Sequence, residues 1–218
     1  MSKLLFFITF HGIGPVDRPL DPGEDRVWCS VEQMNAILDL VQDRPDVRIT
    51  SDDGNRSDLE ILAPALAERG LTADFFVLAG RLESDHFLNA EDLRTLRSMG
   101  MRIGLHGWDH VPWRRLDEAG WTRELVEAKH RLEKCIGEPI TAAACPFGAY
   151  GRETIRRLKD AGVEEIFTSD GGWSEPSRTV VTRNSVGPDR AAGELAPLLA
   201  RRRLALADRA KRVLKGLR

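Results

Sequence analysis

The chain has 218 residues, of which 42% are hydrophobic and 30% charged, with three cysteines and a formal net charge of -2. This length suits a single domain that buries a sizeable core without disulfide bonds. No apolar stretch approaches the roughly 18–20 residues that span a bilayer, and the first apolar run is too short for a signal peptide. An odd number of cysteines without a CxxC pair favours reduced thiols, so we expect a cytoplasmic protein.

Charge is distributed unevenly along the chain. Residues 190–218 contain nine Lys or Arg against Glu194 and Asp208, a balance of +7, whereas residues 1–189 contain 23 basic and 32 acidic side chains, a balance of -9. The acidic body argues against a nucleic-acid partner. Residues 190–218 are expected to form a basic amphipathic helix, which either packs on the body or contacts the anionic inner face of the membrane. We therefore divide the chain into a domain over 1–189 and a basic C-terminal helix over 190–218.

Short β-rich runs alternate with helical patterns along the chain. Seven strands are predicted, at residues 4–10, 47–50, 74–78, 101–105, 140–144, 165–168 and 179–182. Among the intervening helices, one begins with a capping box at Ser30, one is capped by Asn89 and one ends at Gly137. Over 57–69, Pro64 is expected to kink or split the helix. The alternation implies right-handed βαβ units and a parallel sheet of the α/β class.

Functional side chains of parallel α/β folds gather where the strands end. Asp52 and Asp53 follow one predicted strand, and His106 and His110 follow another. Adjacent carboxylates repel each other and need a positive partner, although an Asx-rich turn at Gly54 is a simpler alternative. Two imidazoles and one carboxylate make the three-ligand site with an open position that is typical of catalytic zinc. The second carboxylate can then accept a proton from water.

Three short motifs occur in order: Ser51-Asp52-Asp53-Gly54, His106-Gly107-Trp108-Asp109-His110 and Pro146-Phe147-Gly148. Together they resemble the first three motifs of the polysaccharide deacetylase family, the NodB-homology domain of carbohydrate esterase family 4. The resemblance spans about residues 1–185. It implies a distorted (β/α)7 barrel, here followed by the C-terminal helix. It also implies a hydrolase that removes N-acetyl groups from amino sugars with a divalent metal, commonly zinc.

The resemblance also assigns roles by motif position. Asp52 would be the general base, and Asp53, His106 and His110 would hold one divalent metal, with Zn²⁺ as the expected ion. The backbone N–H of Phe147 would help to hold the oxyanion, a role that does not depend on its side chain.

The sequence departs from the family pattern at three points. Ser51 replaces the usual Phe before the Asp pair. Ala144 occupies the position of the Arg that often braces the base, and we expect Arg183 to take that role, a surface position being the alternative. The late Leu-x-His motif that supplies the general acid is missing, because no His follows His130. His11, at the end of the first strand, is the substitute that we expect, a structural turn residue being the alternative.

Aromatic faces suit sugar rings, and three tryptophans, Trp108, Trp113 and Trp173, lie in or near the expected rim loops, with Trp28 as a further candidate. Trp108 and Trp173, with Asp170 just upstream of the latter, are predicted to contact substrate, although core packing is an equal alternative for each Trp. The expected substrate is an N-acetylated sugar that is nucleotide-linked, lipid-linked or part of an oligosaccharide. Two other functions stay open: a metal-dependent amidase acting on a non-sugar amide or imide, and a catalytically weak carbohydrate-binding member of the family. Retention of Asp52 speaks against the latter, because binding needs only the metal ligands.

Overall fold

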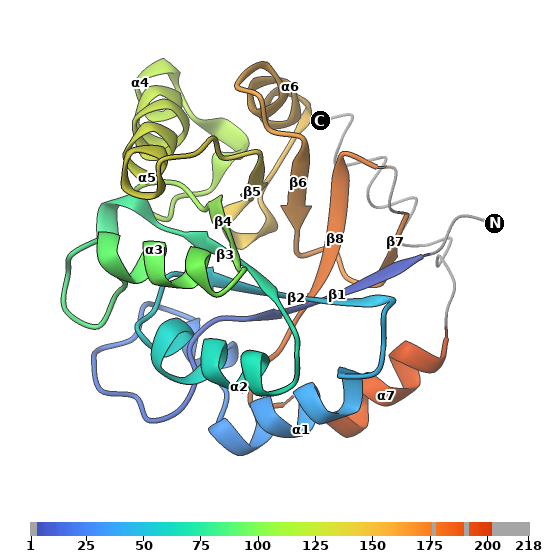
Figure 1. Cartoon of the computed structure of the whole chain (residues 1–218). Helices are drawn as coiled ribbons and strands as arrows, with labels where there is room; N and C mark the ends of the chain where they lie inside the picture. Colours follow the sequence, from blue (N-terminus) through green and yellow to red (C-terminus); the bar gives the residue numbers. More distant parts are fainter. Residues whose placement is uncertain (1–3, 176–177, 190–191, 202–218) are drawn as a thin grey trace.

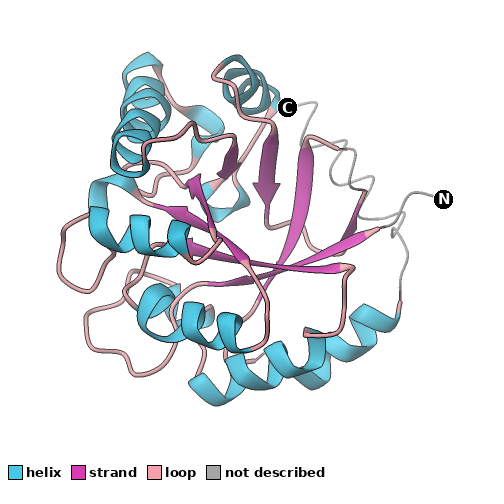
Figure 2. Ribbon diagram, in the orientation of Figure 1, coloured by secondary structure: helices cyan, strands magenta, loops and turns pink. Residues whose placement is uncertain are grey.

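The computed structural model of the chain describes residues 4–175, 178–189 and 192–201. Parallel strands form a closed barrel, and helices surround it (Figures 1 and 2). The strands are β1 (Leu5–Phe10), β2 (Val47–Asp53), β3 (Ala73–Val77), β4 (Arg102–Leu105), β5 (Ala142–Ala144), β6 (Glu165–Thr168), β7 (Trp173–Ser174) and β8 (Val180–Ser185). The α-helices are α1 (Val31–Val41), α2 (Ala63–Glu68), α3 (Ala90–Ser98), α4 (Glu118–Trp121), α5 (Ala128–Ile136), α6 (Arg152–Asp160) and α7 (Ala192–Ala200).

The sheet follows the order β1-β2-β3-β4-β5-β6-β8, and β8 pairs back with β1 to close the barrel. Strand β7 lies outside this ring and pairs antiparallel with the start of β1, at Leu5 and Phe6. The seven-stranded parallel barrel predicted from the sequence is therefore confirmed, and the short strand β7 is an addition. Within the described residues, no helix is long and apolar enough to cross a membrane.

Two of the predicted strands extend further than expected, and both extensions carry polar residues. Strand β2 continues past Thr50 through Asp53, because Asp52 and Asp53 pair in register with β3. Strand β8 continues through Arg183 to Ser185, pairing with β1. Apolar patterning misses such segments, because the interior of this barrel is polar at the carboxyl end of its strands.

The barrel interior is separate from the core that lies between strands and helices. It contains an apolar cluster formed only by strand residues: Phe7, Phe76, Ala142, Ala144, Phe167 and Val181. Gly104 on β4 leaves room for this cluster, since a Cβ there would lie 2.5 Å from the ring of Phe76. Arg183, Asp52 and His106 are also buried, at the end of the barrel where the strands finish. The apolar cluster thus forms the floor of a polar site.

The helix boundaries follow the expected local signals. Ser30 makes its capping box, Asn89 caps α3, and Gly137 ends α5 in a left-handed conformation with φ 75°. The segment containing Pro64 is split, as expected, into a π-helical turn at Asp58–Leu62 and the regular helix α2. This change of helix type just before Pro64 accommodates a ring that would clash with a continuous helix.

Only part of the predicted C-terminal helix over 190–218 is described. Helix α7 packs against α1 and buries Leu195 and Leu199. Figure 1 shows the two helices side by side at the bottom of the view. Residues 202–218, with most of the predicted basic charge, lie outside the described residues.

Candidate metal centre and catalytic site

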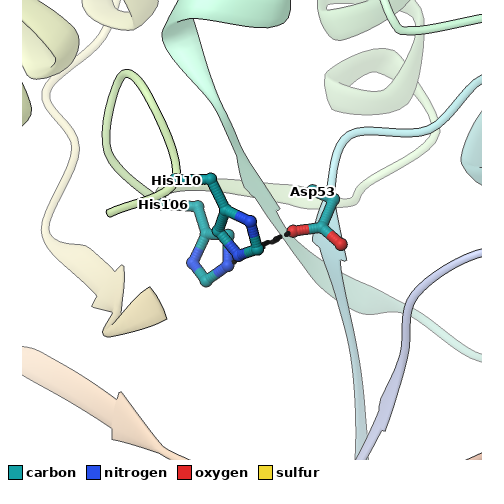
Figure 3. Close-up of side chains that lie close together, drawn as sticks. All are labelled: Asp53, His106 and His110. Atoms are coloured by element: carbon teal, nitrogen blue, oxygen red, sulfur yellow. Dashed lines mark ion pairs between the residues drawn. The ribbon is translucent and has the colours of Figure 1, made fainter. Parts of the chain in front are cut away.

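Asp53, His106 and His110 converge from the ends of β2 and β4. One oxygen of Asp53, Oδ1, lies 3.4 Å from Nε2 of His106 and 3.5 Å from Nε2 of His110. Figure 3 shows both imidazole rings facing the Asp53 carboxylate. Asp53 and His110 adopt positive φ angles of 77° and 57°, which are uncommon for residues other than glycine. The fold therefore maintains an unfavourable backbone at two residues whose side chains meet.

These three side chains fit a divalent metal. Oxygen and nitrogen ligands about 2.0–2.2 Å from a tetrahedral Zn²⁺ lie about 3.3–3.6 Å from one another, which matches the two distances above. The Asp53 Oδ1 atom is buried and has no hydrogen-bond partner among the described residues. His106 Nδ1 lies 2.8 Å from the carbonyl oxygen of Ala144, so a ring that donates from Nδ1 turns an unprotonated Nε2 toward Asp53. We conclude that this group could hold a metal ion.

Burial and the neighbouring charges together set the pKa of each residue in the triad. Burial by itself would raise the pKa of Asp53, but His106, His11 and His110 outweigh it and lower that pKa. Burial opposes protonation of His106, yet Asp52 and Asp53 raise its pKa. Burial and the nearby His106 lower the pKa of His110 to about 4, which leaves its ring neutral and able to bind a metal. At neutral pH Asp53 is therefore ionised and His110 neutral, the protonation states in which these side chains can bind a metal.

Asp52 is held by Arg183, and its Oδ2 also lies 3.9 Å from Nε2 of His106. The guanidinium donates two hydrogen bonds to Asp52, from Nη1 to Oδ1 at 2.6 Å and from Nη2 to Oδ2 at 2.7 Å. Both side chains are buried, with exposed fractions of 4% and 1%. Burial would raise the pKa of Asp52, but Arg183 and His106 overcome this effect and lower it. Asp52 is therefore ionised at neutral pH.

Arg183 reaches Asp52 through the interior of the barrel. Its strand, β8, is separated from β2 by β1, so the side chain crosses the interior face of β1 to reach Asp52. The guanidinium carbon lies 5.1 Å from the ring centre of Phe76 and 5.8 Å from that of Phe167, in cation–π contact. Nη1 also donates to Thr50 Oγ1 at 3.2 Å. The structure thus places Arg183 under Asp52, in the bracing position that the sequence analysis predicts for it.

His11 directly follows β1, the strand that lies between those of Asp52 and Arg183. Its Nε2 is 3.9 Å from Asp52 Oδ2, and its buried Nδ1 has no hydrogen-bond partner among the described residues. Burial lowers the pKa of His11, and the charges of Asp52 and Asp53 offset this only in part. The ring is therefore neutral in the absence of substrate.

A cleft of about 650 Å³ opens above these groups. Its lining includes the triad, Asp52, His11 and Phe147, together with residues 21–24, 26 and 27 of the long loop after β1. Phe147 has a positive φ of 56°, is 61% exposed and stacks on the ring of His110 at 4.4 Å. The predicted catalytic and metal-binding residues are therefore gathered around one cleft.

Three predicted substrate contacts do not line this cleft, and these predictions are corrected here. The Trp108 ring lies between the guanidinium groups of Arg123 and Arg131, at 4.8 and 5.3 Å. Trp173 is in β7, 3% exposed, and its indole N–H donates to the carbonyl oxygen of Leu198 in α7. Its position follows from the turn before it, which reverses the chain and directs β7 toward the start of β1.

Asp170 supports a loop instead of contacting substrate. Its Oδ2 accepts hydrogen bonds from the Tyr150 hydroxyl at 2.7 Å and from Thr168 Oγ1 at 3.1 Å. These bonds connect the chain after β6 with the chain after β5. The prediction of substrate binding by Asp170 is corrected accordingly.

Glu124 is a site-supporting residue that the sequence does not reveal. Its buried carboxylate accepts hydrogen bonds from the backbone N–H groups of Trp108 at 3.0 Å and Asp109 at 2.8 Å. It thereby holds the loop between His106 and His110. A Cβ on Gly107 would lie 2.3 Å from this carboxylate, so the loop can approach Glu124 only with glycine there. In the sequence, Glu124 is indistinguishable from a solvent-facing glutamate.

Asp58 is a second such residue and explains the unusual Ser51. The hydroxyl of Ser51 donates to Asp58 Oδ1 at 2.6 Å, and both residues are fully buried. The other oxygen, Oδ2, has no hydrogen-bond partner among the described residues. Burial raises the pKa of Asp58 well above its ordinary value, and the charges of Asp53 and Asp52 add to this, against the opposing bond from Ser51. A protonated carboxyl therefore lies behind the Asp pair.

Comparisons with known proteins agree with this geometry. The sequence model of the polysaccharide deacetylase family matches residues 40–166. The fold is similar to that of the Streptococcus pyogenes deacetylase PplD in complex with acetate, with 17% identity over 91% of this chain and 99% of that one, at a TM-score of 0.78. It is also similar to BC0361, a polysaccharide deacetylase from Bacillus cereus, with 15% identity over 91% and 69% of the two chains and a TM-score of 0.79. IcaB from Ammonifex degensii matches with 20% identity over 90% and 97%, at a TM-score of 0.70.

Removing Arg183 alone should destabilise the protein strongly. Arg183→Met leaves the Asp52 charge buried without a cation, so we expect a loss of about 3–5 kcal/mol in the free energy of unfolding. The double variant Arg183→Met/Asp52→Asn buries no charge and should recover at least half of that loss. Urea denaturation of chelator-treated protein measures both values. A double variant that is as unstable as Arg183→Met, or less stable, would contradict a direct ion pair.

Asp58→Asn should stabilise the protein in a pH-dependent manner. The raised pKa means that folded Asp58 holds a proton that the unfolded chain releases above about pH 3.9, so its contribution to stability falls as the pH rises toward the folded pKa. Asparagine mimics the protonated form and removes this loss.

Urea unfolding of chelator-treated protein between pH 4 and 8 tests this prediction. The stability difference between Asp58→Asn and wild type should be small at pH 4 and grow with pH. Asp85→Asn, at an exposed aspartate, should show no such trend. A constant difference across the pH range would mean that Asp58 is ionised in the folded state.

Proposed function

The chain belongs to the polysaccharide deacetylase family, and from this premise we propose that it is a Zn²⁺-dependent hydrolase that removes an N-acetyl group from an amino sugar. The observation that carries the proposal is that two adjacent carboxylates, Asp52 and Asp53, have different main contacts. Asp53 faces two imidazoles, whereas Asp52 is held by Arg183 beside the same cleft. Metal binding and proton transfer each have their own carboxylate.

The chain supplies most of the catalytic groups directly. Asp53, His106 and His110 would hold the metal, which when bound supplies a Lewis acid for the acetamide carbonyl and lowers the pKa of water. Asp52 accepts a proton from the attacking water, and Arg183 fixes the orientation of its carboxylate. Phe147 lines the cleft, and its backbone N–H would donate to the developing oxyanion.

His11 supplies the proton to the departing amine. Because its ring is neutral in the resting site, it can act as an acid only after receiving a proton. Asp52 would deliver the proton that it takes from water, since its Oδ2 lies 3.9 Å from Nε2 of His11. Breaking the C–N bond then consumes that proton on the amine nitrogen, and acetate and the free amino sugar leave.

The substrate is proposed to be an N-acetylated sugar that is nucleotide-linked, lipid-linked or part of an oligosaccharide. The cleft volume of about 650 Å³ lies in the range of small-molecule sites. A binding-only function is disfavoured, because binding requires neither Asp52 nor a buried arginine to orient it. A cytoplasmic location, and membrane contact through residues 190–218, stay predictions from the sequence.

Acetate release from a panel of acceptors tests the proposed function. The panel contains UDP-N-acetylglucosamine, a lipid-linked N-acetyl sugar, chito-oligosaccharides and simple non-sugar acetamides. We expect release from at least one sugar by zinc-loaded protein, its loss after chelation and its return with Zn²⁺. Asp52→Asn should lower kcat about 10²–10⁴-fold, the usual range for a general base.

Asp109→Asn is the matched control. Asp109 lies in the same cleft and is exposed, but it pairs with Arg123 outside the proposed machinery. Its variant should retain activity within about threefold of wild type, because exposed ion pairs contribute little. Acetate release that survives both chelation and Asp52→Asn would contradict the mechanism, and release from non-sugar acetamides alone would indicate an amidase.

A further inference from the structure

The charged side chains that line the cleft are almost all paired. Five acidic residues line it, and four of them have an arginine partner: Asp21 with Arg81, Glu24 with Arg18, Asp52 with Arg183 and Asp109 with Arg123. The fifth, Asp53, faces the two imidazoles of the triad. Every acidic side chain that lines the cleft within the described residues therefore has a partner.

Arg26 is the exception on the cationic side. It is exposed and lines the cleft, and its guanidinium has no ion pair or hydrogen bond within the part of the chain that the structure describes. The cleft thus combines a centre that attracts a cation with one unpaired guanidinium at its wall. Once a divalent metal is bound at the triad, the net charge of the open cleft is positive.

Several contacts hold the backbone of the segment that carries Arg26. It forms a 3-10 turn, Glu24–Arg26, and the buried Glu24 accepts a hydrogen bond from the backbone N–H of Asp21 at 2.8 Å. Arg18, which pairs with Glu24, also donates to Asn55 Oδ1 at 2.6 Å, only two residues from Asp53. The backbone of Arg26 also packs closely against Gly187, since a Cβ at residue 187 would lie 1.9 Å from the carbonyl oxygen of Arg26. The backbone of Arg26 is therefore fixed between the metal-binding strand and the chain after β8.

We propose that Arg26 binds an anionic group of the substrate, so that the preferred substrate is an N-acetylated sugar bearing a phosphate or a carboxylate. An arginine presents several N–H donors in a planar fork, which matches the oxygens of either group. No acidic side chain of the cleft competes for it. This assignment rests on the proposed deacetylase function for its kinetic test, and a separate binding test is independent of turnover.

The kinetic test compares substrates that differ in charge. N-acetylglucosamine 1-phosphate and UDP-N-acetylglucosamine carry phosphate, a disaccharide of N-acetylglucosamine and glucuronate carries carboxylate, and chitotriose is neutral. For zinc-loaded wild type we expect a higher kcat/KM on one of the anionic classes than on chitotriose, which identifies the anion. In Arg26→Gln this preference should fall about tenfold, mainly through KM, and Arg26→Lys should keep part of it.

Arg115→Gln is the matched control, because Arg115 is also an exposed arginine in a 3-10 turn but does not line the cleft. It should leave the preference unchanged. An equal preference in wild type and Arg26→Gln would overturn the proposal, as would a wild type that prefers the neutral substrate.

The binding test applies even if no substrate is turned over. Calorimetry measures the affinity of N-acetylglucosamine 1-phosphate and of the glucuronate disaccharide for Asp52→Asn, with and without Arg26→Gln. The measurement is repeated after chelation, so that an anion held by the metal alone is recognised. We expect Arg26→Gln to weaken one of the two anions about tenfold in both series. Unchanged affinity for both would refute the role of Arg26, whereas missing turnover with an Arg26-dependent affinity would refute only the deacetylase function.

Discussion

The ion pair between Arg183 and Asp52 is formed inside the barrel, where the two side chains are only 1% and 4% exposed. A buried carboxylate without a partner would be neutralised by a proton and could no longer accept one. The guanidinium supplies a fixed positive charge and two hydrogen bonds, and the rings of Phe76 and Phe167 supply a polarisable floor beneath it. This arrangement keeps Asp52 ionised and oriented at the base of the cleft.

The same ion pair determines what its neighbour can do. With Asp52 turned to Arg183, the adjacent Asp53 adopts a left-handed backbone and faces His106 and His110. The imidazole of His106 is oriented by the carbonyl oxygen of Ala144. The loop that carries His110 is held by Glu124, which accepts a hydrogen bond from the backbone N–H of Asp109. Two consecutive carboxylates thus acquire different partners, which removes the repulsion expected between them.

Much of the fold and the metal triad could be predicted from one sequence, because strand runs and short motifs are local signals. The contact of Arg183 with Asp52 could be inferred only indirectly, from the alanine at residue 144 where the family often has the bracing arginine. No local signal predicts it, since it joins residues on strands far apart in the chain. Glu124 and Asp58 gave no signal, because buried carboxylates look like exposed ones in a sequence. The position of Trp173 after Asp170, which resembles the family pattern, predicts a residue of the site, but the turn between them reverses the chain and carries Trp173 into the core.

Crystals of the protein soaked with Zn²⁺, measured at the zinc absorption edge, give the most direct test of this division between two carboxylates. The account predicts one strong anomalous peak between Asp53 Oδ1 and the Nε2 atoms of His106 and His110. It also predicts that Asp52 remains uncoordinated, with both of its oxygens on Arg183. A metal coordinated by Asp52, with Arg183 displaced from it, would contradict the account.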